Sequence, residues 1–210
     1  MNPFLLGDDD LSLQSLSEEE LSAIRTSVAW FQRSCYVPYV GLIFDERMQQ
    51  HSHPYGEHVE RPERTKSIIE ALKLSGLAQR MYSIPLRTVK NEELLLIHTP
   101  EHISFVNSLA NSEVRDAKFS LLEMLSAYAN EGTVEAAYIS VSCVLSALDK
   151  IHENIIKSAI CVVRPPGHHA EKDQACGFCF FDNVAIAAAV AIEKYQFKKV
   201  LILGRFVLVH

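Results

Sequence analysis

The feature that most constrains the fold is a strand, loop, helix and strand pattern in the last quarter of the sequence. Ser158–Val163 is almost continuously apolar and rich in β-branched residues, as is typical of a strand covered on both faces. After a loop, Asn183 can cap an alanine-rich helix through about Tyr195, and Val200–Leu203 is a further apolar run. This βαβ pattern predicts two parallel, neighbouring strands joined by a right-handed crossover. We therefore expect an α/β fold with a mostly parallel sheet, helices on both faces, and a ligand site beyond the carboxyl ends of the strands.

The preceding sequence supplies further elements of such a fold. Val40–Phe44 and Met81–Leu86 read as strands. Four helices are expected to begin at a proline or a capping residue followed by an apolar stripe, at Pro62, Asn91, Pro100 and Thr133. For the helix that begins at Pro62, the predicted buried stripe consists of Ile68, Ile69, Leu72 and Leu77, and Gly76 supplies the stop. Residues 111–132 carry no pattern from which we predict an element.

Residues 1–36 differ from the rest of the chain. Ser17 and Glu20 form an S-x-x-E capping box after an acidic stretch, which predicts a tail followed by a helix. Four apolar residues then recur at helical spacing on one face, at Leu21, Ile24, Val28 and Phe31. Trp30 is expected to serve packing.

Composition excludes several classes of function. The net charge of −6 provides no basic face for a phosphate backbone, so we expect no direct nucleic-acid binding. No apolar run approaches the length of a membrane-spanning helix, and the first residues do not resemble a secretory leader. Five cysteines at irregular spacing favour reduced thiols. We expect a nuclear or cytoplasmic protein without a membrane partner.

The loop from Arg164 to Asn183 is densest in chemistry. Its prolines and Gly167 stiffen the exit from the strand and then permit a sharp turn. On a turn, the adjacent rings of His168 and His169 can reach one cavity, where a pair of imidazoles can act as base and then as acid. The alternative is two surface histidines, and the frame at a strand end favours function.

Two other groups of residues leave alternatives open. Cys176 and Cys179 have C-x-x-C spacing, but a redox pair would need the cysteines at a helix start, and a zinc ribbon would need a second pair, which this sequence does not have. We favour a third interpretation, in which Gly177 and Phe178 form a narrow apolar wall beside the histidines while the cysteines pack inside. Three histidines in an earlier loop, His51, His53 and His58, suit either a metal site or a solvated loop lining a cleft, and we favour the loop.

Several segments together resemble one known family. RPPGHHA at 164–170, followed by ACGFCFFDNVAIAA at 175–188, is similar to the histidine loop of zinc-dependent histone deacetylases of the class II branch. Three further segments resemble the first strand, the first active-site loop and the following helices of that family, namely VGLIFDERM, HVERPERTKSI and LIHTPEHI. The resemblance covers about residues 37–203. It implies an arginase/deacetylase-like three-layer sandwich, incomplete at the C-terminus, with residues 37–210 as the N-terminal half of a catalytic domain.

The resemblance also implies a reaction and roles for residues. His168 and His169 would be the catalytic pair, and Gly177 and Phe178 would line the tunnel that takes the acetyl-lysine side chain. The reaction would be hydrolysis of the acetyl-lysine amide, in which Zn²⁺ polarises the carbonyl and activates water. Substrates would be acetylated histones or other acetyl-lysine proteins, corepressor-type proteins are expected partners, and the biological role would be regulation of chromatin and transcription.

The metal side of the pattern departs from the family. Its Asp-x-Asp-x-His motif aligns here with Gly204, Phe206 and Leu208, none of which can bind zinc or orient an imidazole. His210 lies two residues beyond the ligand position and is no replacement. We therefore expect a C-terminally truncated form of a deacetylase that binds no zinc and is inactive as this chain.

Three functional hypotheses follow from the sequence. The first is a member of the deacetylase family, and the second is a non-catalytic regulatory or binding fragment of a deacetylase. The third is a metal-free hydrolase that uses Cys176 or Cys179 as the nucleophile with His168 or His169 as the base; the sequence places no orienting carboxylate for it.

Overall fold

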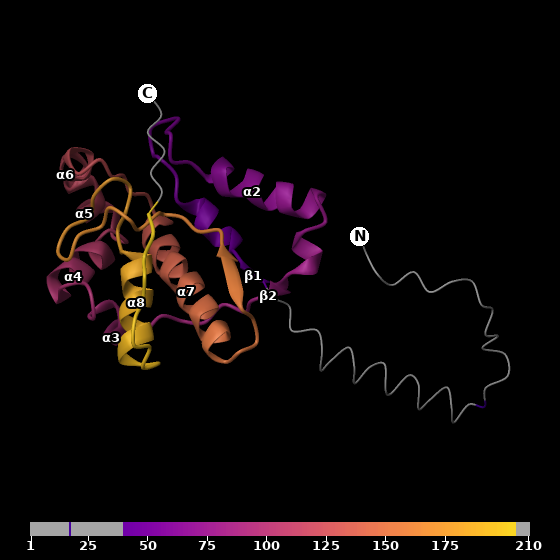
Figure 1. The fold of residues 1–210 in the computed structure, drawn as a ribbon. Helices are drawn as coiled ribbons and strands as arrows, with labels where there is room; N and C mark the ends of the chain where they lie inside the picture. Colours follow the sequence, from indigo (N-terminus) through magenta and orange to yellow (C-terminus); the bar gives the residue numbers. More distant parts are fainter. Residues whose placement is uncertain (1–16, 18–39, 205–210) are drawn as a thin grey trace. The chain divides into compact units, whose positions relative to one another are not determined.

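The computed structural model describes Ser17 and residues 40–204 (Figure 1). The chain divides into two units, Met1–Val37 and Pro38–His210, and the following description concerns the second. The predicted helix with Leu21 and Trp30 lies outside the described residues, and so do Phe206, Leu208 and His210. Among residues 40–204, no helix has both the length and the apolar character needed to cross a bilayer.

The described residues form a parallel three-stranded sheet in the order β2-β1-β3. Its strands are β1 (Val40–Ile43), β2 (Tyr82–Ser83) and β3 (Ser158–Cys161). Gly41 pairs with Tyr82 on one side and with Ala159 on the other. The three strands predicted within residues 40–163 are therefore present, each shorter than the apolar run that predicts it.

Seven α-helices and two short 3₁₀ helices surround the sheet in the described residues. The α-helices are α2 (Pro62–Leu74), α3 (Asn91–Leu94), α4 (Pro100–Ser108), α5 (Ser112–Ala117), α6 (Phe119–Met124), α7 (Thr133–His152) and α8 (Asn183–Glu193). The 3₁₀ helices are η2 (Glu46–Gln50) and η3 (Ala78–Arg80). Proline occupies the first turn of both α2 and α4, as predicted.

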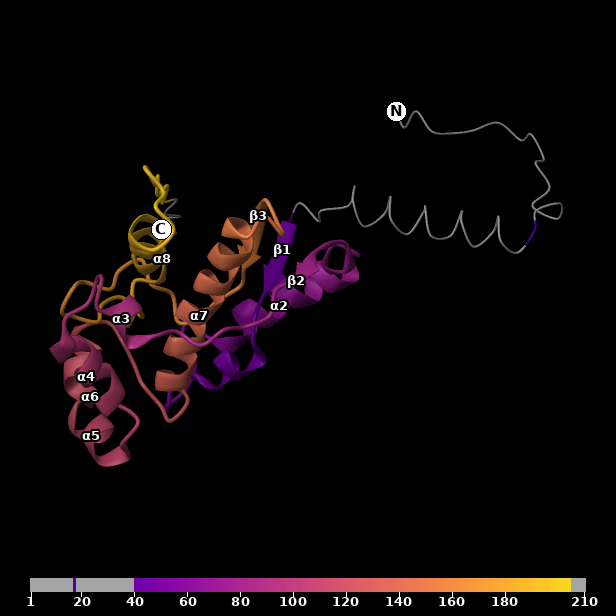
Figure 2. The same cartoon turned by 90° about the horizontal axis from the view of Figure 1, so that it is seen from below.

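Helices cover both faces of the sheet. Neighbouring residues of β1 point to opposite faces, so their contacts show which helix packs on each face. Leu42 packs with Ile69 of α2, whereas Ile43 packs with Ile139 and Cys143 of α7 (Figure 2). This arrangement of helix, parallel sheet and helix confirms the predicted α/β class.

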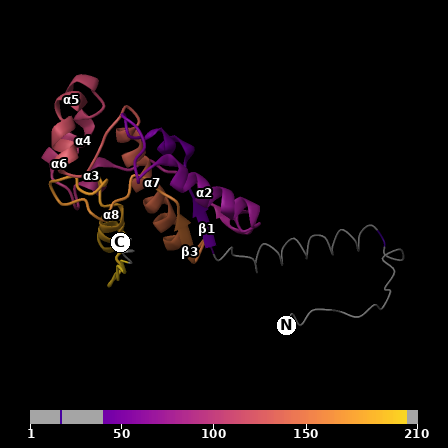
Figure 3. The same cartoon turned by 90° about the horizontal axis from the view of Figure 1, so that it is seen from above.

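A third hydrophobic cluster lies between α7, α8 and the shorter helices α3, α4 and α6. Its fully buried members include Leu94, Val106, Leu109, Leu122 and Leu145. Figures 2 and 3 show α4, α5 and α6 together on the side of α7 away from β1. α7 is therefore buried around most of its circumference, and it joins the sheet to this group of helices.

The structure corrects several sequence-based expectations. Asp182, not Asn183, caps α8 by accepting a hydrogen bond from the amide of Ala185 at 2.9 Å. Ile68 of α2 and Leu77, which follows the helix, are partly exposed. Of the four residues of the predicted stripe, only Ile69 and Leu72 reach the small hydrophobic cluster under α2.

The predicted strand at Val200–Leu203 is absent from the described structure. These residues have no regular secondary structure, and Leu201 and Leu203 are 80% and 84% exposed. β3 pairs with β1, and Ile160 on β3 is 37% exposed, so β3 is not covered on both faces. The apolar pattern identified residues suited to burial, but a strand forms only where backbone hydrogen bonds pair it with a neighbour, and in the described structure residues 200–203 do not pair with the open edge of β3.

Replacing a core residue of α7 should destabilise the chain far more than replacing a surface leucine. We expect Leu145→Ala to lower the free energy of unfolding by about 2–5 kcal/mol, because it opens a cavity in a fully buried site. The matched control Leu74→Ala, at an 89% exposed position at the end of α2, should change it by less than about 0.5 kcal/mol. Urea denaturation measures both values. Equal effects would contradict the assignment of α7 as the centre of the core.

Candidate functional site

The histidine loop is anchored at its first residue by a buried ion pair. Arg164 is fully buried, and its guanidinium contacts both carboxylate oxygens of Glu60, with Nε–Oε1 at 3.0 Å and Nη2–Oε2 at 2.8 Å. Arg164 Nη1 also donates to the carbonyl oxygens of Met48, at 2.7 Å, and of His51. The hydroxyl of Tyr128 donates to Glu60 Oε2 at 2.7 Å. This bidentate geometry fixes the exit of β3 against the loop that precedes α2.

The electrostatics of this network keep its groups in one protonation state. Burial by itself raises the pKa of Glu60, but the hydrogen bonds from Arg164 and Tyr128 outweigh burial, so the pKa lies below its ordinary value. Burial and the charge of Arg164 lower the pKa of His51 to about 3. His51 is therefore neutral at physiological pH; its ring stacks on Tyr128 and its Nδ1 lies 2.8 Å from Thr133 Oγ1.

The next part of the loop is held by α7 and α8. Ser140 of α7 donates to the carbonyl oxygen of Pro165 at 2.9 Å and accepts from the side chain of Asn183 at 2.7 Å. A Cβ at Gly167 would lie 2.6 Å from the backbone nitrogen of Asn183 and 2.7 Å from the carbonyl oxygen of Phe181. Only glycine fits this close backbone approach, so the turn before the histidines is fixed against the start of α8.

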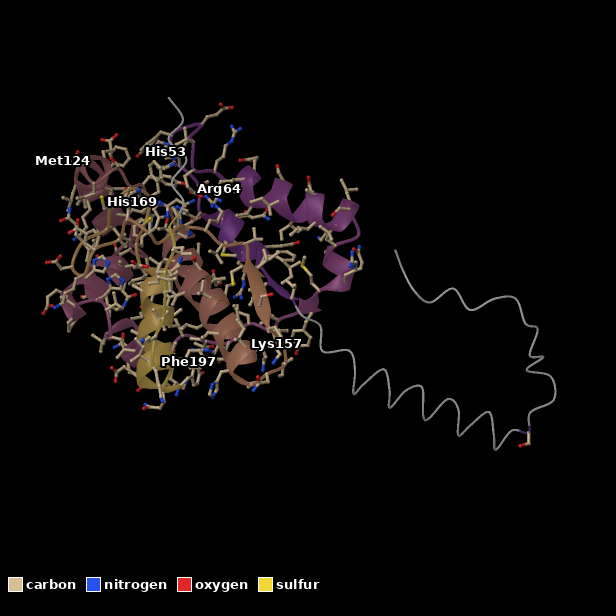
Figure 4. All side chains as sticks on the ribbon, viewed as in Figure 1. His53, Arg64, Met124, Lys157, His169 and Phe197 are labelled. Atoms are coloured by element: carbon tan, nitrogen blue, oxygen red, sulfur yellow. The ribbon has the colours of Figure 1, made fainter. Side chains whose placement is uncertain are left out.

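The rings of the adjacent residues His168 and His169 lie close together, and His168 lines the groove described below. Both side chains are exposed, and their ring centroids lie 4.4 Å apart at an interplanar angle of 58°. Partial desolvation of the ring, followed by the charge of the neighbouring His169, lowers the pKa of His168. Figure 4 shows His169 on the same side of the molecule as His53 and Arg64, beyond the end of β3.

A groove of about 760 Å³ extends from His168 along the exposed side of β3. The groove is lined by β3, by Val162 and Val163 directly after it, by α2, α7 and α8, and by the histidine loop. The lining is mostly apolar. The lining includes Ile68, Val144, Ile160, His168, Phe178 and Val184. The groove could therefore receive an apolar chain beside an imidazole.

Gly177 and Phe178 form a turn beside the histidines. Both have positive φ angles, of 52° and 69°. Their amides donate to the carbonyl oxygens of Leu125 and Ser126, each at 2.9 Å. A Cβ at Gly177 would lie 2.8 Å from the ring of His169, while the Phe178 ring meets His58 edge-on at a centroid distance of 4.8 Å. These two residues thus form a fixed turn beside His169 and His58.

The described residues do not fit a zinc site. They contain no group of three or more His, Cys, Asp or Glu side chains placed to hold a metal ion. His53 and His58 stack on each other at 5.4 Å, whereas His51 stacks on Tyr128 in the buried network. Gly204, at the end of the described chain, is exposed and offers no side-chain ligand.

The sequence did not identify Glu60 and Tyr128, which bind Arg164 at the start of the histidine loop. A signal for Glu60 exists in retrospect, since Arg164 follows an apolar strand directly and a buried arginine requires a carboxylate partner. No comparable signal identifies Tyr128, because residues 111–132 show no clear pattern.

Breaking the Arg164–Glu60 pair should destabilise the chain strongly. We expect Arg164→Met to lower the free energy of unfolding by about 3–5 kcal/mol, because it leaves the buried Glu60 carboxylate without its cation. Removing both charges with Arg164→Met and Glu60→Met should cost less than the sum of the two single changes. As a control, Arg47→Met removes an exposed pair with Asp45 and should cost at most about 1 kcal/mol. Additive single effects at Arg164 and Glu60 would contradict direct coupling.

Acid should weaken the same network. His51 has a folded pKa of about 3 against an ordinary 6.5, so the unfolded state binds more protons in this window and stability falls as the pH drops through it. The lowered pKa of Glu60 acts in the same direction at lower pH, where its stabilising contribution is lost. Urea denaturation between about pH 7 and about pH 5 should show this loss, and His51→Asn should flatten the dependence. An unchanged slope in that variant would contradict the neutral, buried state of His51.

Comparison with known proteins identifies the family to which this chain is similar. A family model described as "Histone deacetylase domain" matches residues 58–204, more than half of the chain. The chain is similar to Histone deacetylase 5 of Arabidopsis thaliana, with 39% identity over 168 residues. It is also similar to Polyamine deacetylase HDAC10 of Danio rerio, with 32% identity over 164 residues. A solved structure titled "Crystal Structure of HDA15 HD domain" matches with a TM-score of 0.59 and 33% identity.

The matches cover most of this chain but a minor part of each relative. The Arabidopsis alignment covers 78% of this chain and 26% of the relative, and the Danio alignment covers 77% and 24%. The solved domain is matched over 72% of this chain and 43% of its own length. The strand order, the histidine loop and these matches agree, and we conclude that the chain belongs to the histone deacetylase family.

Proposed function

We propose that this chain carries the histidine and tunnel-wall side of an acetyl-lysine deacetylase site and does not hydrolyse acetyl-lysine by itself. The observation that carries the proposal is the placement of the His168–His169 pair next to the Gly177–Phe178 turn, with His168 and Phe178 lining an apolar groove. Aliphatic carbons of an acetylated lysine suit such a groove, and imidazoles suit proton transfer at the amide.

Each residue has a distinct role in this proposal. The lowered pKa of His168 leaves its imidazole neutral at physiological pH, so it can accept a proton. His169 contacts the Gly177 turn and acts as the electrostatic or acid partner. Phe178, braced by His58, forms the wall that contacts the aliphatic part of the side chain.

The inactivity of the chain by itself rests on the metal side of the site. The family is zinc-dependent, yet the described residues lack a group of ligands, and the aligned positions 206 and 208 hold Phe and Leu. We therefore assign no step of hydrolysis to a metal in this chain. For the third hypothesis, a cysteine hydrolase, Cys179 is disfavoured as the nucleophile because burial raises the pKa of its thiol to about 11.

A non-catalytic binding or regulatory role is the second candidate, and the open groove along β3 favours it. In this role the chain engages acetylated histones or other acetyl-lysine proteins, or corepressor-type proteins, in the nucleus or cytoplasm. Neither candidate includes a nucleic-acid or membrane partner, in keeping with the net charge of −6.

Metal analysis and an activity assay test the proposal together. We expect the purified 210-residue chain to contain far less than one zinc per chain, and to hydrolyse neither an acetyl-lysine peptide nor an N-acetylated polyamine, with or without added Zn²⁺. The polyamine is included because some relatives are named polyamine deacetylases. A complete deacetylase serves as the positive control.

Two outcomes would overturn the claim of inactivity. Stoichiometric zinc with chelator-sensitive turnover would show that the chain builds a metal site from other residues. Chelator-resistant turnover that thiol alkylation abolishes would favour the cysteine hydrolase.

A further inference from the structure

Cys176 and Cys179 face each other across the turn that carries Gly177 and Phe178. The amide of Cys176 donates to the carbonyl oxygen of Cys179 at 3.1 Å, and the amide of Cys179 donates back at 2.9 Å. The two residues therefore form an antiparallel bridge. Both corner residues have positive φ, as in the tight turns that join antiparallel strands.

This pairing places the two cysteines within reach of a disulfide. Residues that exchange both backbone hydrogen bonds have Cα atoms about 5.5 Å apart, and their side chains leave the same face of the ribbon. Disulfides span Cα distances of roughly 4.4–6.8 Å. The amides of Gly177 and Phe178 are held from outside by residues 125 and 126, so the turn keeps this shape whether or not the sulfurs are bonded.

The two thiols differ in a way that suits stepwise oxidation. Cys176 is half-buried and open to a small oxidant, whereas Cys179 is fully buried. Burial raises the pKa of Cys179 to about 11, and the neighbouring Cys176 adds to the effect. Cys143 is also fully buried, and burial is the main cause of its raised pKa. It packs with Ile43 and Ile139 between β1 and α7, away from the turn.

We propose that Cys176 and Cys179 are a reversible thiol–disulfide pair built into the wall beside His169. A peroxide oxidises Cys176 first: its O–O bond breaks, an S–O bond forms, and the peroxide leaves as water or an alcohol. The sulfur of Cys179 then attacks the sulfenic acid, an S–S bond forms, and the hydroxyl group leaves as water with the thiol proton. A small thiol reductant such as glutathione returns both thiols by exchange.

The bond would change contacts that reach the histidines. In the reduced chain, the Cys179 sulfur accepts from the amide of His169 at 3.4 Å and donates to the carbonyl oxygen of Gly177 at 3.3 Å. Oxidation removes that donor and turns the sulfur toward Cys176. The effect on substrate binding rests on the proposed function, but formation of the bond does not.

Peptide mapping by mass spectrometry tests the proposal on the full 210-residue chain. After treatment with hydrogen peroxide and alkylation of the remaining thiols, we expect one major cross-link, between Cys176 and Cys179, that dithiothreitol reverses. Cys176→Ser should abolish it. Cys179→Ser should instead leave Cys176 as a sulfenic acid that dimedone traps, because its resolving thiol is gone.

Cys161→Ser is the matched control and should leave the cross-link unchanged, since Cys161 belongs to β3 and packs in the hydrophobic cluster between the sheet and α7. Persistence of both thiols under conditions that oxidise glutathione would overturn the proposal, as would a major cross-link of Cys176 to Cys35, Cys143 or Cys161. A change in the amide NMR signal of His169 on oxidation, restored by reduction, is expected as well. None of these readouts depends on zinc or turnover, so their failure is separable from failure of the proposed deacetylase role.

Discussion

The ion pair between Arg164 and Glu60 is the interaction on which the site depends. It joins the end of β3 to the segment that leads into α2, two parts of the chain separated by about a hundred residues. Two charges out of water are tolerable only with complete hydrogen bonding, and here Tyr128 and two backbone carbonyls supply the remaining partners. The histidine loop thus leaves the sheet from a point that can adopt only one arrangement.

The rest of the site follows from what surrounds that fixed point. Helices α7 and α8 hold the Pro-Pro-Gly turn through Ser140 and Asn183, and the Leu125–Ser126 carbonyls hold the Gly177 turn. The histidines are therefore exposed, while the backbone on either side of them is tied to the core. This combination is typical of sites that place reactive side chains in solvent on a rigid scaffold.

Local patterns predicted three strands and most helix starts, because each depends on residues close in sequence. Expectations that depended on distant partners fared differently. Val200–Leu203 has a strand-like composition, but composition does not establish pairing with β3, the expected neighbour, and the run is exposed. Glu60 and Tyr128 were missed because their role exists only once Arg164 is brought to them by the fold. Asp182 and Asn183 both suit a cap, and backbone geometry decides between them.

The crowding at Gly167 has a consequence for how this protein would respond to random mutation. Glycine has no Cβ, and this leaves just enough room for the backbone of residues 181–183. The Cβ of any other amino acid at position 167 would push the histidine loop away from the first turn of α8. A mutational scan would score this position as severely intolerant, and a selection for any function of the histidine loop would group it with the histidines. The loss would report on interatomic space and not on chemistry, and only a measurement of folding would separate the two.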